Sequence, residues 1–372
     1  MTIPLPSQEA LIALLRRICQ TPAPTFVEAA RGELIAELWQ QAGAEVSRDS
    51  VGNVIAELAG SGPRVLLAAH LDTVFDAGAD VTVRESEGRL CAPGIGDNSA
   101  SLAVVTALLQ VLQAAPEVPR PRLALAATVG EEGLGDLRGI RQLLSERPQD
   151  FDMVIAVDGH LGTIVNAAVG SKRYEVELSA KGGHSWGDFP SPSAVHALGE
   201  AIHALTRLKI PMAPRTTFNV GQVWGGTSIN AIAQRAGLNL DLRSLDADVL
   251  AGLEAEAVAR LRRTAKRHGV ELTLRLVGDR LVANPPNTAL VAAAQAALLE
   301  VGVTPCLSAS STDANAAMAM GLPAIAFGVY YGGDAHRLAE WLEPASLLLG
   351  YRALWLLLTA LLRLPSEART LW

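Results

Sequence analysis

Apolar runs of strand length alternate with helical segments along most of the chain. Runs that are apolar at every position are typical of strands buried on both faces, as in a mostly parallel sheet covered by helices. Four such runs stand out, at Val65–Ala69, Leu123–Val129, Met153–Val157 and Ala324–Val329. Helices are predicted from Ser7 to Ile18, after Thr25 up to about Gly43, and from Ser99 to Leu112. The pattern predicts an α/β fold with helices on both faces of the sheet.

The stretch from about Ser171 to Leu276 has a different pattern, because apolar and polar residues alternate in its strands. Alternation is typical of a sheet with one face in water. The predicted elements are a strand at 174–178, a helix at 195–205, strands at 217–223 and 238–243, a helix at 246–268 and a strand at 272–276. This β-α-β-β-α-β order is typical of a ferredoxin-like α+β unit. We therefore expect one domain from residues 1–170 and 281–372, and a second, inserted domain from residues 171–280.

Charge and cysteine content exclude several classes of protein. The 372 residues carry a formal charge of 31 − 38 = −7, which argues against partners such as nucleic acid or an acidic membrane surface. Three separated cysteines without a CxxC pair argue against a disulfide framework and a thiolate zinc site. The first residues lack a signal-peptide pattern, and the apolar stretch Ala353–Leu362 is too short to span a bilayer. A cytoplasmic protein with a buried terminal helix is expected.

Acids and histidines follow the apolar runs. The groups that come after the four runs, in chain order, are His70 and Asp72, Glu131 and Glu132, Asp158, and His336. Asp97 lies in the sequence GIGDN, just before a predicted helix. In an open α/β sheet, ligands bind beyond the carboxyl ends of the strands. We therefore expect these side chains at one rim of the sheet.

Such a rim predicts a metal site. Crowded carboxylates repel one another, and divalent cations relieve that repulsion. Imidazole and carboxylate ligands without thiolate suit Zn²⁺, and also Co²⁺ or Mn²⁺. Two ions can share a bridging carboxylate and clamp a water nucleophile, while an unligated carboxylate takes its proton. A single acid at a strand end is more often a cap or turn residue, so the prediction depends on the whole set occurring together.

Several motifs together resemble the metallopeptidase-20 family of dinuclear zinc hydrolases, which includes peptidase T, carboxypeptidase G, acetylornithine deacetylase and succinyl-diaminopimelate desuccinylase. The motifs are HLDT at 70–73, GIGDN at 94–98, GEEG at 130–133, VDG at 157–159 and DAHRLAE at 334–340. GN at 52–53 and STDAN at 311–315 extend the likeness over nearly the whole chain. The resemblance implies a zinc-hydrolase α/β/α catalytic domain with an inserted ferredoxin-like lid, through which the chain would form a homodimer.

The resemblance also implies a role for each residue of the rim. Glu131 would be the general base, and Asp72 would hold the ring of His70. Two divalent ions per chain, zinc or else cobalt or manganese, would share Asp97, with His70 and Asp158 at one ion and Glu132 and His336 at the other.

Three residues of the inserted domain match family positions. His184, in GGHS at 182–185, would stabilise the oxyanion in a neighbouring subunit's site, although it could be only part of a glycine-rich turn. Asn230 and Arg243 would hold substrate, although Arg243 could be a solvated residue on the polar face of its strand.

The sequence departs from the family pattern at two places. Asn98 stands after Asp97 where the family often has a second aspartate. The segment after His184 is unusual, and Trp186, Asp188 and Phe189 could shape a pocket or only pack, so no role is assigned to them. His160 could line the pocket, but a loop position without a role is favoured.

The favoured function is hydrolysis of short peptides by an aminopeptidase- or tripeptidase-like enzyme. Aspartate at position 158 and the segment NAAVGS at 166–171 resemble peptidase T. The alternatives are an N-acyl amino-acid deacylase or a carboxypeptidase, because these reactions share the same metal chemistry. A dinucleotide-dependent oxidoreductase is disfavoured because Ser99 replaces the third glycine of GxGxxG. The complete ligand set argues against a non-catalytic binding protein, and the lack of GxSxG argues against a serine hydrolase.

Overall fold

The computed structural model describes residues 5–285 and 287–363, and the chain divides into two compact units. The first unit comprises the chain up to Ala168 and again from Ala283, and the second comprises Val169–Val282. Each unit has a sheet and a hydrophobic core of its own.

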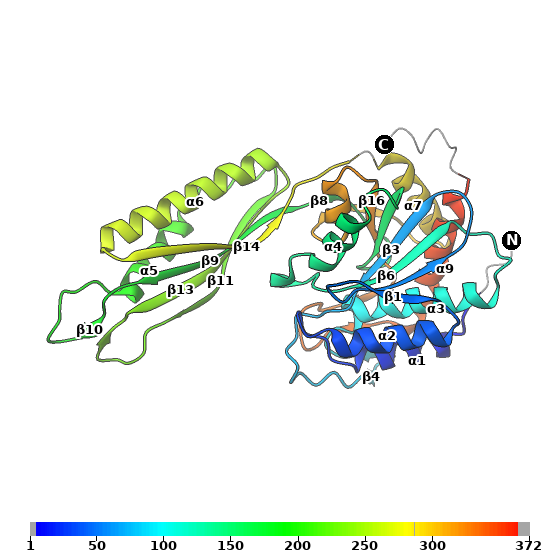
Figure 1. The fold of residues 1–372 in the computed structure, drawn as a ribbon, viewed down its shortest axis with the longest axis horizontal. Coiled ribbons are helices and arrows are strands. Elements are labelled where there is room, and N and C mark those ends of the chain that lie inside the picture. Colours follow the sequence, from blue (N-terminus) through cyan, green and yellow to red (C-terminus); the bar gives the residue numbers. More distant parts are fainter. Residues whose placement is uncertain (1–4, 286, 364–372) are drawn as a thin grey trace. The chain divides into compact units, whose positions relative to one another are not determined.

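An eight-stranded mixed sheet forms the centre of the first unit, in the order β1-β2-β6-β3-β7-β16-β8-β15 (Figure 1). Its strands are β1 (Val46–Arg48), β2 (Val54–Leu58), β3 (Arg64–His70), β6 (Arg122–Thr128), β7 (Met153–Val157), β8 (Thr163–Ala168), β15 (Cys306–Ser310) and β16 (Ala324–Phe327). The four predicted apolar runs are the four adjacent strands β6, β3, β7 and β16, which are all parallel. Antiparallel pairs occur on both sides of these four, between β2 and β6 and between β16 and β8.

Helices cover both faces of this sheet, as the sequence predicts. Val65, Leu67 and Ala69 of β3 belong to one core, whereas Leu66 and Ala68 belong to the other, because successive strand residues point to opposite faces. The first core is closed by α1 (Gln8–Cys19), α2 (Ala29–Gln41), α3 (Ser101–Ala114), α7 (Thr288–Glu300) and α9 (Pro344–Leu361). The second is closed by α4 (Arg138–Glu146) and α8 (Ala314–Ala319).

One predicted helix boundary is wrong, and the predicted terminal helix extends beyond its apolar stretch. Helix α2 begins at Ala29 rather than directly after Thr25, because the intervening residues form a turn in which the Val27 N–H donates to the Pro24 carbonyl over 2.7 Å. The terminal apolar stretch belongs to a longer helix, α9, of 18 residues. By length and composition alone, α9 and the segment Ile95–Ala114 could each cross a membrane, but 56% and 83% of their apolar windows are buried inside the protein. Both therefore serve as core helices in this fold.

A small antiparallel sheet brings two distant segments of the first unit together. Its strands, in spatial order, are β17 (Gly332–Gly333), β18 (Trp341–Leu342), β5 (Arg89–Cys91) and β4 (Arg84–Ser86). Trp341 pairs with Cys91, and the Ala92 N–H donates to the Glu340 carbonyl over 3.1 Å. The loop before β18 and the short helical segment η1 (Ile95–Ala100) are thereby held next to each other.

The second unit has the predicted β-α-β-β-α-β order. It consists of β9 (Gly170–Ser179), α5 (Ala194–Thr206), β11 (Thr216–Gly225), β13 (Arg235–Ser244), α6 (Ala247–His268) and β14 (Glu271–Arg280). The antiparallel sheet has the order β11-β13-β9-β14, and α5 and α6 pack on one face of it (Figure 1, green to yellow). Asp246 caps α6, and Gly269, with φ 63°, ends it. A two-stranded ribbon of β10 (Gly183–His184) and β12 (Ala231–Ile232) completes the unit.

Candidate metal centre

Six side chains that the sequence singles out meet at the carboxyl ends of the central strands. His70 is the last residue of β3, the two glutamates follow β6, and Asp158 follows β7. Asp97 lies in η1, and His336 lies between β17 and β18. Three sets have potential ligand atoms within 4.8 Å of one another: His70, Glu131 and Glu132; His70, Asp97 and Asp158; Asp97, Glu132 and His336.

Asp97 lies between the two histidines. Its Oδ1 is 3.0 Å from Nε2 of His70, and its Oδ2 is 3.0 Å from Nε2 of His336. Nε2 of His336 is also 3.1 Å from Oε1 of Glu132. One carboxylate thus presents a different oxygen to each imidazole, which is the arrangement that a ligand shared by two ions requires.

Asp72 organises the turn that carries the two glutamates. Its fully buried carboxylate accepts hydrogen bonds of 2.9 Å from the backbone N–H groups of Glu131 and Glu132, and another of 2.9 Å from the hydroxyl of Thr25. Nδ1 of His70 is 3.0 Å from the backbone oxygen of Asp72 but 3.6 Å from its carboxylate. Asp72 therefore orients His70 mainly through its carbonyl and uses its side chain to fix the glutamates.

Glu340 holds the loop that carries Asp97, a role that is not predicted from the sequence. Its buried carboxylate accepts hydrogen bonds from the backbone N–H groups of Gly94, Gly96 and Asp97 at 2.8, 2.9 and 2.8 Å. Burial raises the pKa of Glu340 to about 7. The available signal was its place in the DAHRLAE motif, four residues after His336.

Asn98, which stands where the family often has a second aspartate, is bonded to the central sheet. Its side chain is fully buried, and Nδ2 donates a 3.1 Å hydrogen bond to the carbonyl of Val157, the last residue of β7. A carboxylate could not donate this bond. The amide therefore ties η1 to the strand that delivers Asp158.

The charged groups of the site shift one another's pKa values. Burial raises the pKa of Asp158 to about 7, and the nearby charge of Asp97 adds to the effect. Burial by itself would lower the pKa of His70, but hydrogen bonds with Asp72 and Asp97 hold it well above its usual value. Hydrogen bonds with Asp97 and Glu132 raise the pKa of His336 to about 11. Crowded carboxylates with two imidazoles beside them fit divalent cations such as Zn²⁺.

The predicted residues of the second unit lie on its ribbon and on β13. His184 pairs with Ala231, and the carbonyl of Asn230 accepts a 3.0 Å hydrogen bond from the Ser185 N–H. Nδ1 of His184 accepts the N–H groups of Trp186 and Gly187 at 3.2 and 3.3 Å. The neutral ring must then carry its proton on Nε2.

Arg243 and His160, which the sequence left between two interpretations, both have partners in the structure. Arg243 donates from Nε to Asp241 over 2.7 Å, on the face of the second unit's sheet opposite the helices. The ring of His160 packs against that of Tyr330 with 5.1 Å between centroids, and burial lowers the pKa of this histidine.

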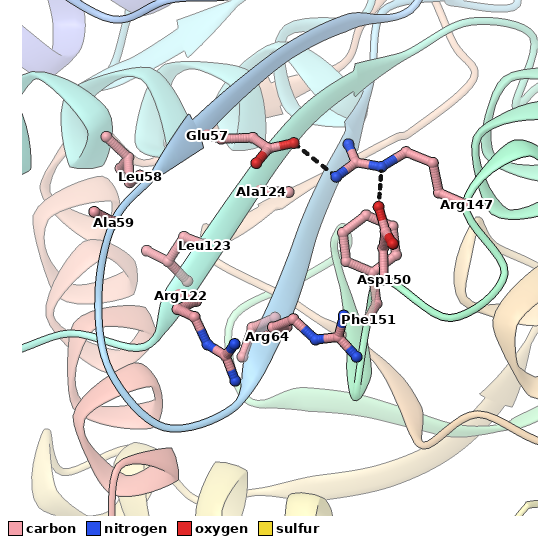
Figure 2. A pocket seen from close by; sticks show the side chains of 11 residues that line it. Glu57, Leu58, Ala59, Arg64, Arg122, Leu123, Ala124, Arg147, Asp150 and Phe151 are labelled. Atoms are coloured by element: carbon pink, nitrogen blue, oxygen red, sulfur yellow. Dashed lines mark hydrogen bonds and ion pairs between the residues drawn. The ribbon is translucent and has the colours of Figure 1, made fainter.

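A hollow of about 430 Å³ lies away from the metal centre, at the opposite ends of β3 and β6 (Figure 2). Arg64 and Arg122, the first residues of these strands, line it. Arg147 in its wall pairs with Glu57 and Asp150 at 2.6 Å each, so all three charged groups have a partner. Among the described residues, the groups able to hold a metal all lie at the other rim. We therefore do not assign the chemistry to this hollow.

Comparison with known proteins agrees with the fold. The family model described as peptidase family M20/M25/M40 matches residues 66–360. The chain is 24% identical to the acetylornithine deacetylase of Shigella sonnei, over 67% of this chain and 72% of that protein. Three further curated relatives include probable carboxypeptidases of Ajellomyces capsulatus and Aspergillus flavus. They are 25% to 32% identical and are matched over only 45% to 61% of their length, so the chain spans about half of them.

Two solved structures have a similar fold. The tripeptidase from Staphylococcus aureus gives a TM-score of 0.80 at 23% identity and covers 97% of this chain and 100% of its own. The aminopeptidase PepT from Bacillus cereus gives a TM-score of 0.74 at 23% identity and covers 95% and 99%.

Proposed function

Because this chain belongs to peptidase family M20/M25/M40, a metal-dependent family, we propose that it hydrolyses amide bonds of short peptides with two bound divalent ions. The observation that carries the proposal is the position of Asp97, with one carboxylate oxygen 3.0 Å from each of two imidazoles. Glu132 and Asp158 complete two ligand sets around it. Zinc is the metal that this donor set suits best, with cobalt or manganese as alternatives.

In this proposal His70 and Asp158 would hold one ion, Glu132 and His336 would hold the other, and Asp97 would serve both sets. When bound, the ions would supply an activated water and polarise the carbonyl of the substrate. Glu131, next to Glu132, would be the base that accepts a proton from the water and returns it to the leaving amine. Asp72 supports this role because it fixes the backbone N–H groups of both glutamates at 2.9 Å.

We propose that His184 stabilises the oxyanion in the site of a second copy of the chain. The two backbone N–H groups that bind Nδ1 leave Nε2–H as the donor of the neutral ring, and a donor is what a developing negative charge requires. A cytoplasmic homodimer formed through the second unit belongs to the same proposal, with Asn230 and Arg243 contacting substrate.

The short-peptide proposal is supported by fold similarity to a tripeptidase and to aminopeptidase PepT. Similarity to an acetylornithine deacetylase supports the second candidate, an N-acyl amino-acid deacylase, and similarity to carboxypeptidases supports a third. A panel of di- and tripeptides beside N-acetyl and N-succinyl amino acids, assayed with Zn²⁺, Co²⁺ and Mn²⁺, separates them. Cleavage only of peptides with free amino termini would favour the first candidate.

The substitution Glu131→Gln tests the mechanism. We expect the variant to keep about two metal ions per chain and to lose turnover by several orders of magnitude, because the base is gone while the ligands remain. Metal analysis of both proteins and steady-state rates are the measurements. A near-normal rate would reassign the base, and a metal-free wild-type protein unaffected by chelators would remove the mechanism.

Subunit mixing tests His184. If the ring acts across a dimer, heterodimers of a His184→Ala chain and a Glu131→Gln chain contain one intact site and should regain part of the activity. Demonstrated heterodimers with no recovery would place the action of His184 within one chain or remove it.

A further inference from the structure

Phe26 occupies a backbone position that does not suit it. The Val27 N–H donates to the Pro24 carbonyl over 2.7 Å and closes a turn, in which Phe26 is the third residue with φ 74°. A positive φ at this position of a turn favours glycine or asparagine, and a bulky side chain is strained there. The Phe26 side chain is also 58% exposed, so its burial gives little energy in return. Neither backbone preference nor burial therefore accounts for this phenylalanine.

The turn is attached directly to the metal centre. Thr25, the residue before Phe26, donates its hydroxyl to Asp72 over 2.9 Å, and Asp72 in turn fixes Glu131 and Glu132. The Thr73 N–H donates to the Ala23 carbonyl over 2.9 Å, and Pro24 pairs with Thr73. The backbone of Phe26 is thus anchored one residue from a side chain that organises the site.

Arg138 holds the ring of Phe26 from the other side. Its guanidinium carbon is 5.3 Å from the ring centroid, and its Nη2 is 2.9 Å from both carboxylate oxygens of Glu28. The same side chain packs on Gly130, where an added Cβ would lie 2.5–2.8 Å from it. The Phe26 ring is therefore placed beside the turn that carries the two glutamates, and Glu28 neutralises the charge that supports it.

Three other exposed apolar side chains lie close to the site in sequence. Val27 is 59% exposed, Val74 is 42% exposed and Leu134 is 51% exposed. Each is two residues along the chain from a residue of the centre or from Thr25, which supports it: Thr25, Asp72 and Glu132, in the same order. Large apolar side chains exposed around a polar centre are typical of a ligand-binding surface.

We propose that Phe26 is a specificity-determining residue that packs against an apolar side chain or acyl group next to the amide bond to be cleaved. This inference rests on the proposed function and deepens it by naming the substrate class: short peptides or N-acyl amino acids with an apolar group at that position. A charged group there would lose hydration without gaining a partner, because Arg138 is paired with Glu28.

The test is Phe26→Gly, with Leu299→Ala as a control at another exposed apolar residue, on α7. Peptides that differ only in alanine, leucine, phenylalanine or aspartate on each side of the scissile bond are compared by kcat/KM. We expect Phe26→Gly to reduce the preference for leucine or phenylalanine over alanine by about 10-fold or more. The Tm should stay at or above that of the wild type, because glycine relieves the backbone strain. Leu299→Ala should leave the preference unchanged.

An equal loss on all substrates, or a lower Tm with the preference intact, would show a structural role and overturn the proposal. The same peptides are also titrated into zinc-loaded Glu131→Gln protein, with and without Phe26→Gly, to measure Kd without turnover. A wild-type protein that cleaves no amide would sink the proposed function, while a binding preference for apolar peptides that Phe26→Gly removes would still support the role of Phe26. Binding without such a preference, or no binding at all, would overturn that role whatever the rates are.

Discussion

At the scale of single residues, the pKa of an aspartate in this site depends on the groups around it. Asp97 and Asp158 are both half-buried carboxylates of the candidate metal centre. Contacts with two imidazoles lower the pKa of Asp97 in spite of its burial, whereas burial and the charge of Asp97 raise that of Asp158. Asp72 is kept ionised by His70 and by backbone N–H groups, although burial opposes this. The three aspartates have the same side chain, and their pKa values differ because their contacts differ.

Metal uptake by the metal-free protein should release protons near neutral pH. The raised pKa values of His70 and His336 mean that both rings are charged at pH 7 in the absence of metal. The ion pairs of His336 stabilise the metal-free fold fully below about pH 6.5, and this stabilisation is lost as the pH rises through about 11. An imidazole must be neutral to bind a metal, so the apparent affinity should rise with pH. Calorimetry at pH 7 in two buffers with different ionisation enthalpies measures the protons, and a value of zero would contradict the prediction.

The substitution Asp72→Asn should weaken metal binding without removing a ligand. The amide keeps one acceptor oxygen for the two N–H groups that the carboxylate now binds separately, so the turn of Glu131 and Glu132 loosens. We expect metal affinity to fall by about 10- to 100-fold. Competition with a chelator gives the affinity, and an unchanged value would show that the carbonyl of Asp72 alone positions the site.

At the scale of elements, the side chains of the candidate metal centre lie at the ends of long strands or next to very short paired strands. Three adjacent parallel strands, β6, β3 and β7, deliver His70, both glutamates and Asp158. Their all-apolar pattern makes them predictable from sequence. Asp97 and His336 instead meet through β18 and β5, strands of two and three residues about 250 positions apart. Such short strands carry almost no hydrophobic pattern, so their pairing could not be predicted.

Replacing Glu340 by glutamine should loosen the loop that carries Asp97. A glutamine side chain offers one oxygen for three backbone N–H groups and turns an N–H₂ toward the others. Each buried N–H left without a partner costs about 1–3 kcal/mol. We expect a lower Tm and weaker metal binding, whereas Glu343→Gln, an exposed neighbour, should change neither. Calorimetric unfolding and metal titration measure both effects, and identical behaviour of the two variants would contradict this role.

At the scale of the whole molecule, the second unit is an insertion with its own core. The residues that flank it, Ala168 and Ala283, are joined by a 2.9 Å backbone hydrogen bond within the first unit. The two points of the first unit between which the second unit is inserted are thus close enough for a short linker to connect them. Each unit forms its main sheet from its own strands.

Removal of residues 169–282, with a short glycine-serine linker in their place, should leave a first unit that folds and binds metal. All six groups of the metal centre lie in that unit, so about two ions per chain should remain. Amide hydrolysis should fall steeply, because His184 is lost. Circular dichroism and metal analysis check the first expectation. An unfolded or metal-free product would show that the centre depends on the second unit.

The sequence by itself determined the parallel core strands, the order of elements in the second unit and the family, because repeated apolar periods and contiguous motifs are local signals. Only the tertiary structure decided that the carbonyl of Asp72 orients His70, that Glu340 holds the loop of Asp97, and that Phe26 stands strained and exposed at the rim. Each of these depends on distances between segments far apart in the chain, or on a backbone angle. Distances between remote segments and the backbone angle of a single residue produce no hydrophobic periodicity in the sequence.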